Sequence, residues 1–153
     1  MGRHICTSKT ADLSPLGNER QHEYIEVSEA LNDERLLKYF AQPVMLENRE
    51  KIDWYTDYKG PIERYDNLSD EDRLQVETEL KELGRILTLK AQKTPREEQK
   101  IILKNIQFIP GEDSILKVGA HVVLVNWSHK KRAQRQNSLT IGEILKDLNL
   151  MQE

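Results

Sequence analysis

The sequence feature that most constrains the fold is an amphipathic pattern over residues 69–89. Four aliphatic residues recur in it at intervals of four, three and four positions: Val76, Leu80, Leu83 and Leu87. This spacing places them on one face of an α-helix, which must pack against another element to leave water. Ser69 can cap the helix, and the three acidic residues after it suit the positive end of the helix dipole. The pattern therefore predicts a long helix that ends at about Leu89.

Three shorter segments also carry a helical pattern. Leucine and aromatic residues within 28–40 predict a helix that ends before the following proline. The sequence TPRE at 94–97 combines a capping box with a proline at the first helical position, and it opens a second helix. A further capping box at 140–143 opens a short amphipathic helix within residues 138–153.

A period of two, typical of β-strands, replaces the helical period in two regions. Apolar and polar residues alternate over 44–65, which predicts two or three short antiparallel strands. Residues 114–118 and 121–127 predict two more strands, and the second of these is expected at the centre of its sheet because both of its faces are apolar. Together these patterns predict the α+β class, with a small antiparallel sheet packed against one long and two or three short helices.

Length and composition predict one folded domain with polar extensions. A chain of 153 residues suits a single domain, while 37% hydrophobic and 32% charged residues make it polar, with a thin core. Residues 1–27 have no sustained period and are expected to form a flexible N-terminal arm. The single α+β domain is predicted over 28–128, a basic linker over 129–137 and a C-terminal amphipathic helix over 138–153.

Composition also disfavours several classes of protein. No apolar run approaches the ~18 residues that span a bilayer, so no transmembrane segment is expected. The beginning of the chain has no continuous apolar stretch, which predicts no cleaved secretory signal. The single cysteine, Cys6, has no partner for an intramolecular disulfide, which fits a cytoplasmic protein. A formal net charge of −3 does not suggest a global nucleic-acid binder.

The sequence carries no motif for metal binding, cofactor binding or nucleophilic catalysis. The four histidines and Cys6 do not cluster at the spacing of zinc ligands. Ser128 and His129 are neighbours on a predicted strand and therefore point to opposite faces, which makes them a poor nucleophile and base. No catalytic residue, metal ligand or cofactor is predicted, and an enzyme is the less favoured class.

One pair of carboxylates leaves the enzyme alternative open. Asp53 and Asp57 lie on the polar face of the strand predicted at 52–58, two alternate positions apart. Such a pair could serve as general acid and base. The favoured interpretation is a solvated sheet face, because alternating strands commonly turn one face to water.

Aromatic residues are concentrated in a short stretch of the chain. Six of the nine fall within 27 residues: Tyr39, Phe40, Trp54, Tyr55, Tyr58 and Tyr65. The simpler interpretation is that large rings cover a thin core. The alternative is a docking surface, since tyrosine and tryptophan are enriched at interface hot spots. The partner-binding candidates here are Trp54, Tyr55 and Tyr58, with Tyr55 as the best exposed anchor.

The predicted C-terminal helix supplies a second set of partner-binding candidates. Its apolar side comprises Ile141, Ile144, Leu145 and Leu148. An isolated helix of this length is marginal in water, so this side must pack against something. Packing on its own domain is the simpler interpretation, and packing into a groove of another protein is the alternative.

A basic run precedes that helix and could bind anions. Its cations are Lys130, Lys131, Arg132 and Arg135. They could contact phosphates of nucleic acid or an anionic membrane surface. The run lacks interleaved aromatic residues, so a solvated linker is the favoured interpretation.

Residues 51–73 resemble a segment of the SrfA-type virulence-associated proteins of Gram-negative bacteria. The matching positions are Ile52, Asp53, Trp54, Tyr55, Gly60 and Ser69, with Val125-Asn126-Trp127 in a later strand. The resemblance extends over about residues 44–128 and implies a bacterial protein with a role in virulence or envelope-associated assemblies. No catalytic residues are established for that family, so none is carried over. Family members are longer and continue into a membrane-associated region, whereas the last residues of this sequence predict an amphipathic helix.

These observations favour a non-enzymatic protein-binding or accessory protein of a bacterial virulence- or envelope-associated system. The missing catalytic motifs, the concentrated aromatic residues and the separate C-terminal helix support this prediction. The alternatives are a small carboxylate-dependent enzyme and an anion or nucleic-acid binder that uses the basic linker.

Overall fold

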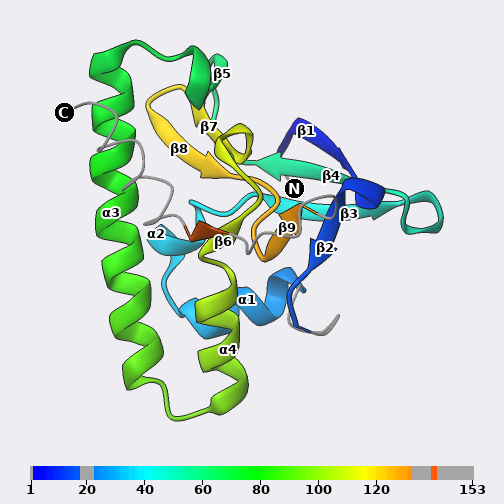
Figure 1. The fold of residues 1–153 in the computed structure, drawn as a ribbon, viewed down its shortest axis with the longest axis vertical. Coiled ribbons are helices and arrows are strands. Elements are labelled where there is room, and N and C mark those ends of the chain that lie inside the picture. The colour runs from blue at the N-terminus through cyan, green and yellow to red at the C-terminus, as the bar shows by residue number, and fades with distance from the viewer. Residues whose placement is uncertain (1, 18–22, 132–138, 141–153) are drawn as a thin grey trace.

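The computed structural model describes residues 2–17, 23–131 and 139–140 (Figure 1). The α+β class is confirmed, since small antiparallel sheets pack with one long and three shorter α-helices. Figure 1 shows the longest helix, α3, along one side of the molecule and the sheets on the other. The helix predicted within residues 138–153 lies outside the described residues.

Helix α3, Asp70–Lys93, confirms the long helix and extends beyond the predicted end at Leu89. The Ser69 hydroxyl accepts a hydrogen bond from the backbone N–H of Asp72 at 3.2 Å, which caps the first turn. The side that faces the core carries the four expected aliphatic residues and Ala91. The burial of Ala91 explains the extra turn, because its small side chain continues the apolar side.

The helix predicted within 28–40 is two helices, α1 Tyr24–Leu31 and α2 Glu34–Leu37. Between them Asn32 adopts a left-handed conformation with φ 48°, which ends α1. The Asp33 side chain then accepts hydrogen bonds from the backbone N–H groups of Arg35 and Leu36 and starts α2. Helix α4, Glu97–Asn105, follows α3 and packs on both α3 and α1.

The first sheet contains β1 Arg3–Lys9, β4 Lys51–Thr56 and β3 Gln42–Leu46 in the order β1-β4-β3, all antiparallel. A second pairing joins β2 Leu13–Pro15 to β9 His129–Lys131. The prediction of a flexible arm over 1–27 is therefore wrong for the described residues. The prediction of a basic linker from residue 129 is also wrong where β9 forms. Both segments are ordered by distant strands, and local periodicity does not encode such pairing.

The second three-stranded sheet contains β5 Ile62–Arg64, β7 Ile115–Val118 and β8 His121–Leu124 in the order β5-β7-β8. The prediction that the strand beginning at His121 is central is wrong, because β8 ends the sheet and β7 is central. Residues 39–41 cover the outer edge of β8, where the Ala41 N–H donates to Leu124 O at 3.0 Å. Strand β8 is therefore hydrogen-bonded on both edges, and its residues Val122, Val123 and Leu124 are all buried.

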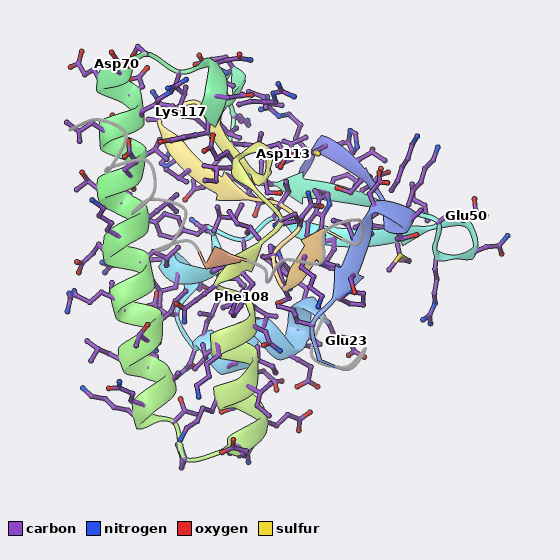
Figure 2. All side chains as sticks on the ribbon, viewed as in Figure 1. Glu23, Glu50, Asp70, Phe108, Asp113 and Lys117 are labelled. Carbon is purple, nitrogen blue, oxygen red and sulfur yellow. The ribbon has the colours of Figure 1, made fainter. Side chains whose placement is uncertain are left out.

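The remaining elements are short. The two-residue strands β6 Phe108–Ile109 and β10 Leu139–Thr140 pair with each other. The 3₁₀ turns are η1 Thr10–Asp12, η3 Glu47–Arg49, η4 Tyr65–Asn67 and η5 Glu112–Ser114. Turn η3 closes the β3–β4 hairpin, which projects from the molecule with Glu50 at its end (Figures 1 and 2).

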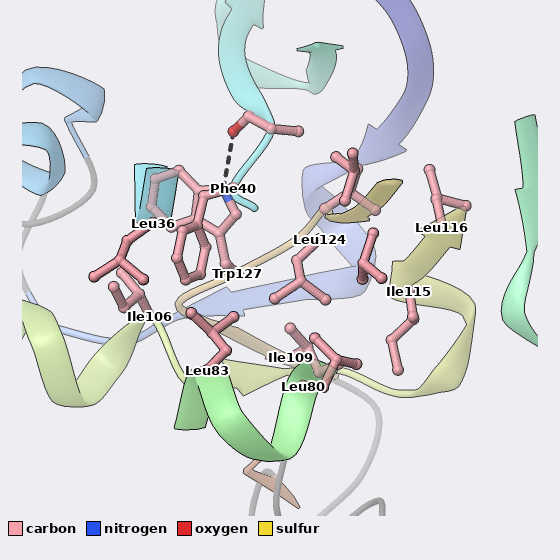
Figure 3. Close-up of a cluster of buried hydrophobic side chains, with 14 of the residues drawn as sticks. Leu36, Phe40, Leu80, Leu83, Ile106, Ile109, Ile115, Leu116, Leu124 and Trp127 are labelled. Atoms are coloured by element: carbon pink, nitrogen blue, oxygen red, sulfur yellow. Dashed lines mark hydrogen bonds between the residues drawn. The ribbon is translucent and has the colours of Figure 1, made fainter. Parts of the chain in front are cut away.

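The hydrophobic core lies between α3, α4 and the sheets. Figure 3 shows side chains that these elements contribute: Leu80, Leu83, Ile106, Ile109, Ile115 and Leu124. The Trp127 indole Nε1 donates to Ala41 O at 2.9 Å within this cluster. Its ring meets Phe40 and Trp54 edge to face, with centroids 6.2 and 5.7 Å away. Each such aromatic pair contributes about 0.5–1.5 kcal/mol beyond its buried area.

A buried polar network joins the N-terminal strand to the far end of the chain. The Trp54 indole Nε1 donates to Ser8 Oγ at 3.1 Å, and Ser8 Oγ donates to Asn126 Oδ1. The Asn126 amide then donates to Ser114 Oγ at 3.0 Å, and Ser114 is fully buried. The network fixes β1 on β4 and against the segment that follows β8.

Two glycines allow the exit of β4 to cross the β7–β8 turn closely. Gly60 and Gly119 have φ values of +113° and +61°, which side chains rarely tolerate. A Cβ at Gly60 would lie 2.8 Å from Gly119 Cα, and one at Gly119 would lie 2.6 Å from Lys59 O. This crossing brings Tyr58, just after β4, beside His121 at the start of β8.

Candidate binding groove

Two adjoining cavities lie where α2, the end of β4 and the start of β8 meet. Their volumes are about 250 and 130 Å³, and Lys38 and Tyr58 line both of them. Four tyrosines line one or both cavities: Tyr24, Tyr39, Tyr55 and Tyr58. The two cavities form one concave site, which we call the tyrosine groove.

A stacked pair of rings forms one wall of the larger cavity. The rings of Tyr58 and His121 lie parallel, with centroids 3.8 Å apart and an angle of 7° between their planes. Val122 continues this wall along β8. Stacking holds the Tyr58 ring in place, although the residue follows the last position of β4.

A hydrogen bond between two helical regions also lies at the larger cavity. The Tyr39 hydroxyl, just after α2, donates to Glu79 Oε1 of α3 at 3.1 Å. Burial, followed by the charge of Glu79, raises the pKa of Tyr39 to about 12. Burial, followed by the same carboxylate, also raises the pKa of Tyr58. These hydroxyls therefore remain protonated hydrogen-bond donors at neutral pH.

The smaller cavity is more aromatic. Phe40 and the rings of Tyr24 and Tyr55 line it, together with Asp57. Burial, followed by the charge of Asp57, raises the pKa of Tyr24. Tyr55 is half-buried and meets the His4 ring edge to face, with centroids 5.6 Å apart. This part of the groove offers flat apolar surface with hydroxyl groups.

Two exposed cations stand at the groove. Arg35 belongs to α2, and Lys38 caps the C-terminal end of that helix. Neither side chain forms an ion pair with another residue in the described parts of the chain. Both cations therefore remain available to a bound group.

The structure places the aromatic candidates from the sequence in two different environments. Tyr55 and Tyr58 both line the tyrosine groove. The prediction that Trp54 binds a partner is wrong, because its side chain is completely buried and its indole donates a hydrogen bond to Ser8. The alternation of β4 turns Trp54 toward the core together with Ile52.

Sequence patterns did not identify the groove residues that lie outside 39–65. Tyr24 falls in the segment expected to be a flexible arm, while Arg35 and His121 come from a helix and a strand far apart in sequence. Only tertiary packing brings these residues together, so no local spacing could reveal them.

The two carboxylates of the enzyme alternative have different surroundings. Asp53 accepts a hydrogen bond from Thr7 Oγ1 at 2.6 Å, and its Oδ1 lies 3.3 Å from His4 Nε2. Asp57 lies beyond the end of β4 and lines the smaller cavity, where Asp53 is absent. Asp53 is thus occupied by β1, and the groove holds only one of the two acids.

The remaining site candidates lie at or beyond the end of the described chain. Lys130 is partly buried in β9, and Lys131 is the last residue of that strand. Arg132 and Arg135 lie outside the described residues. So do the apolar residues of the predicted C-terminal helix: Ile141, Ile144, Leu145 and Leu148.

A second buried polar group lies on α3, away from the groove. Glu77 is 1% exposed, and neither of its carboxylate oxygens has a hydrogen-bond partner. The nearby Tyr65 hydroxyl is also buried without a partner, and burial followed by the charge of Glu77 raises its pKa.

Across the described residues, no group of three or more histidine, cysteine or acidic side chains could hold a metal ion. No described helix is both long enough and apolar enough to cross a membrane.

Comparisons of the chain with protein-family models, with curated proteins and with solved structures gave no match.

Proposed function

We propose that the protein is a non-enzymatic protein-binding protein, and that a segment of the partner binds in the tyrosine groove. The observation that carries this proposal is the concave site in which four tyrosines converge with two cations that form no ion pair within the described part of the chain. Tyrosine rings supply rigid apolar contact area with a polar end, which is why they are enriched at interface hot spots.

The chemistry of the groove favours binding over catalysis. Among the described lining residues, the acids are Glu79, which is bonded to Tyr39, and Asp57. General acid–base catalysis needs a side chain positioned at the reacting proton, and the His121 ring of the groove is instead stacked on Tyr58. The groove instead offers aromatic surface, hydroxyl donors and positive charge, which suit recognition of another chain.

The resemblance to SrfA-type proteins supplies the setting of the proposal. It suggests a bacterial protein, cytoplasmic by its single unpaired cysteine, that serves a virulence- or envelope-associated assembly. The partner is then another component of that assembly.

A photo-crosslinking amino acid placed at Tyr55 tests the proposal in cells that make the full-length protein. We expect a defined partner to be cross-linked from position 55 and lost when Tyr58 is also changed to alanine. The matched control is the same crosslinker at Leu89, which is exposed on α3 away from the groove. Equal cross-linking from both positions, or none from position 55, would contradict the proposal.

A further inference from the structure

We infer that the partner segment in the tyrosine groove is an acidic peptide, with a carboxylate side chain against Arg35 and Lys38 and an apolar side chain in the smaller cavity. This inference rests on the proposed function and adds the chemistry of the bound segment.

The position of the two cations supports a carboxylate ligand. Arg35 and Lys38 are three residues apart, so they project from one side of the same helical turn. Both line the larger cavity, and Lys38 also lines the smaller one. A carboxylate placed between them would accept charge-assisted hydrogen bonds from an arginine fork and an ammonium group.

The larger cavity carries two cations, Arg35 and Lys38, against one described acid, Glu79, which leaves an excess of positive charge. Glu79 already accepts a hydrogen bond from the Tyr39 hydroxyl. It belongs to α3, whereas Arg35 belongs to α2. Asp57 lines only the smaller cavity. A segment that carries one or two carboxylates can avoid both acids, whereas a long polyanion would meet repulsion from them.

The number of cations also favours a peptide over nucleic acid. Nucleic-acid binding typically neutralises about 6–10 phosphates. The tyrosine groove offers two cations, which match one carboxylate. The smaller cavity, about 130 Å³ and bordered by Phe40, Tyr24 and Tyr55, accepts one apolar side chain beside that carboxylate.

Selection from a library of random peptides displayed on phage tests the inference with the full-length protein. We expect the selected peptides to share an Asp or Glu next to an aromatic or aliphatic residue. A synthetic peptide of the selected sequence should bind the R35Q/K38Q variant at least tenfold more weakly, and its affinity should fall with salt. The K93Q/R96Q variant removes two other exposed cations and should bind like wild type.

The other outcomes separate this inference from the proposed function. Peptides that need Tyr55 and Tyr58 but bind R35Q/K38Q normally would overturn the acidic segment and leave the groove as a binding site. Peptides that need neither pair, or a library that yields no binder, would overturn both. A mixed-sequence oligonucleotide that binds wild type but not R35Q/K38Q, and displaces the peptide, would overturn the peptide in favour of nucleic acid.

Discussion

At the residue scale, Glu77 is expected to lower the stability of the folded protein. Its carboxylate is buried on α3 without a hydrogen-bond partner, next to an equally unpartnered Tyr65 hydroxyl. A buried carboxylate without a partner destabilises a folded protein, and glutamine lowers that cost because its amide cannot ionise. We expect Glu77→Gln to raise the free energy of unfolding by about 1–3 kcal/mol, measured by urea denaturation.

The control for this prediction is Glu29→Gln on α1, where the side chain is exposed. This change should leave the free energy of unfolding within about 0.5 kcal/mol of wild type. If Glu77→Gln is less stable than wild type, the carboxylate has a favourable interaction in solution that its surroundings do not explain.

The two glycines Gly119 and Gly84 should respond to alanine in opposite directions. At Gly119 the φ of +61° and the contact with Lys59 O oppose a Cβ, so alanine should destabilise by about 1–3 kcal/mol. Gly84 lies inside α3 with no atom within 4 Å of an added Cβ, so alanine should stabilise by about 0.5–1 kcal/mol. Thermal unfolding of both variants measures the contrast, and equal shifts would contradict it.

At the residue scale, sequence identified part of the groove. Tyr55 and Tyr58, two partner-binding candidates from the aromatic cluster, line the groove, and their role in binding stays a prediction. Trp54 was a wrong candidate, since a docking ring and a core ring look alike in composition. The period of two places Trp54 with Ile52 and places Tyr55 on the other face. It also places Tyr58 with Trp54, and Tyr58 lines the groove because β4 ends at Thr56.

At the element scale, the bond between Tyr39 and Glu79 couples the segment after α2 to α3. The pKa of Tyr39 is about 12 in the folded state and near 10 when unfolded, so the unfolded chain loses this proton first. The contribution of Tyr39 to the free energy of unfolding is complete below pH 10. It is lost as pH rises from 10 to 12, so the free energy of unfolding falls over this range. We expect this fall to be smaller in Tyr39→Phe.

Urea denaturation at several pH values between 8 and 11 measures this difference between wild type and Tyr39→Phe. The other tyrosines with raised pKa, Tyr24, Tyr58 and Tyr65, titrate in both proteins and cancel in the comparison. Parallel pH dependences would show that Tyr39 ionises equally easily in the folded and unfolded chains.

Helices were predicted better than strands for a physical reason. The stripe of α3 is a local signal, since it lies within a few turns of the chain. The sequence TPRE correctly predicted a helix after it, but the predicted capping box is wrong. Helix α4 begins after Arg96 without a side-chain cap, and the Thr94 hydroxyl donates to Lys90 O at the end of α3. The break at Asn32 was missed because its left-handed conformation adds no change to the apolar pattern. Strands β1 and β2 were missed because their partners are far away in sequence.

At the scale of the whole molecule, the N-terminal strands belong to the fold. Strand β1 pairs along β4, and its Ser8 bonds the Trp54 indole. We expect removal of residues 2–12 to expose Trp54 to water and to lower the urea midpoint of unfolding. A red shift of tryptophan emission reports the exposure, because both tryptophans are buried in the intact chain.

The matched comparison is Thr7→Ala, which removes a side chain on the exposed side of β1 but keeps the strand. Its emission should equal that of wild type. Unchanged emission after the deletion would mean that β1 does not cover Trp54 in solution.

The arrangement of the sheets could not be derived from sequence. Helical and alternating patterns established the elements and the α+β class, but not which strands pair. Strand β8 ends its sheet, and its outer edge is hydrogen-bonded by residues 39–41, which come from a different part of the chain. The groove could not be predicted from sequence for the same reason, because Arg35, Tyr58 and His121 meet only after the second sheet has formed.

The pairing of β2 with β9 has a consequence for synthesis on the ribosome. The two strands lie more than a hundred residues apart, so at about 5–20 residues per second β2 emerges several seconds before its partner. During that interval the nascent chain holds an unpaired strand edge, which is the kind of surface that chaperones protect. We expect this pairing to form only after translation has passed residue 131.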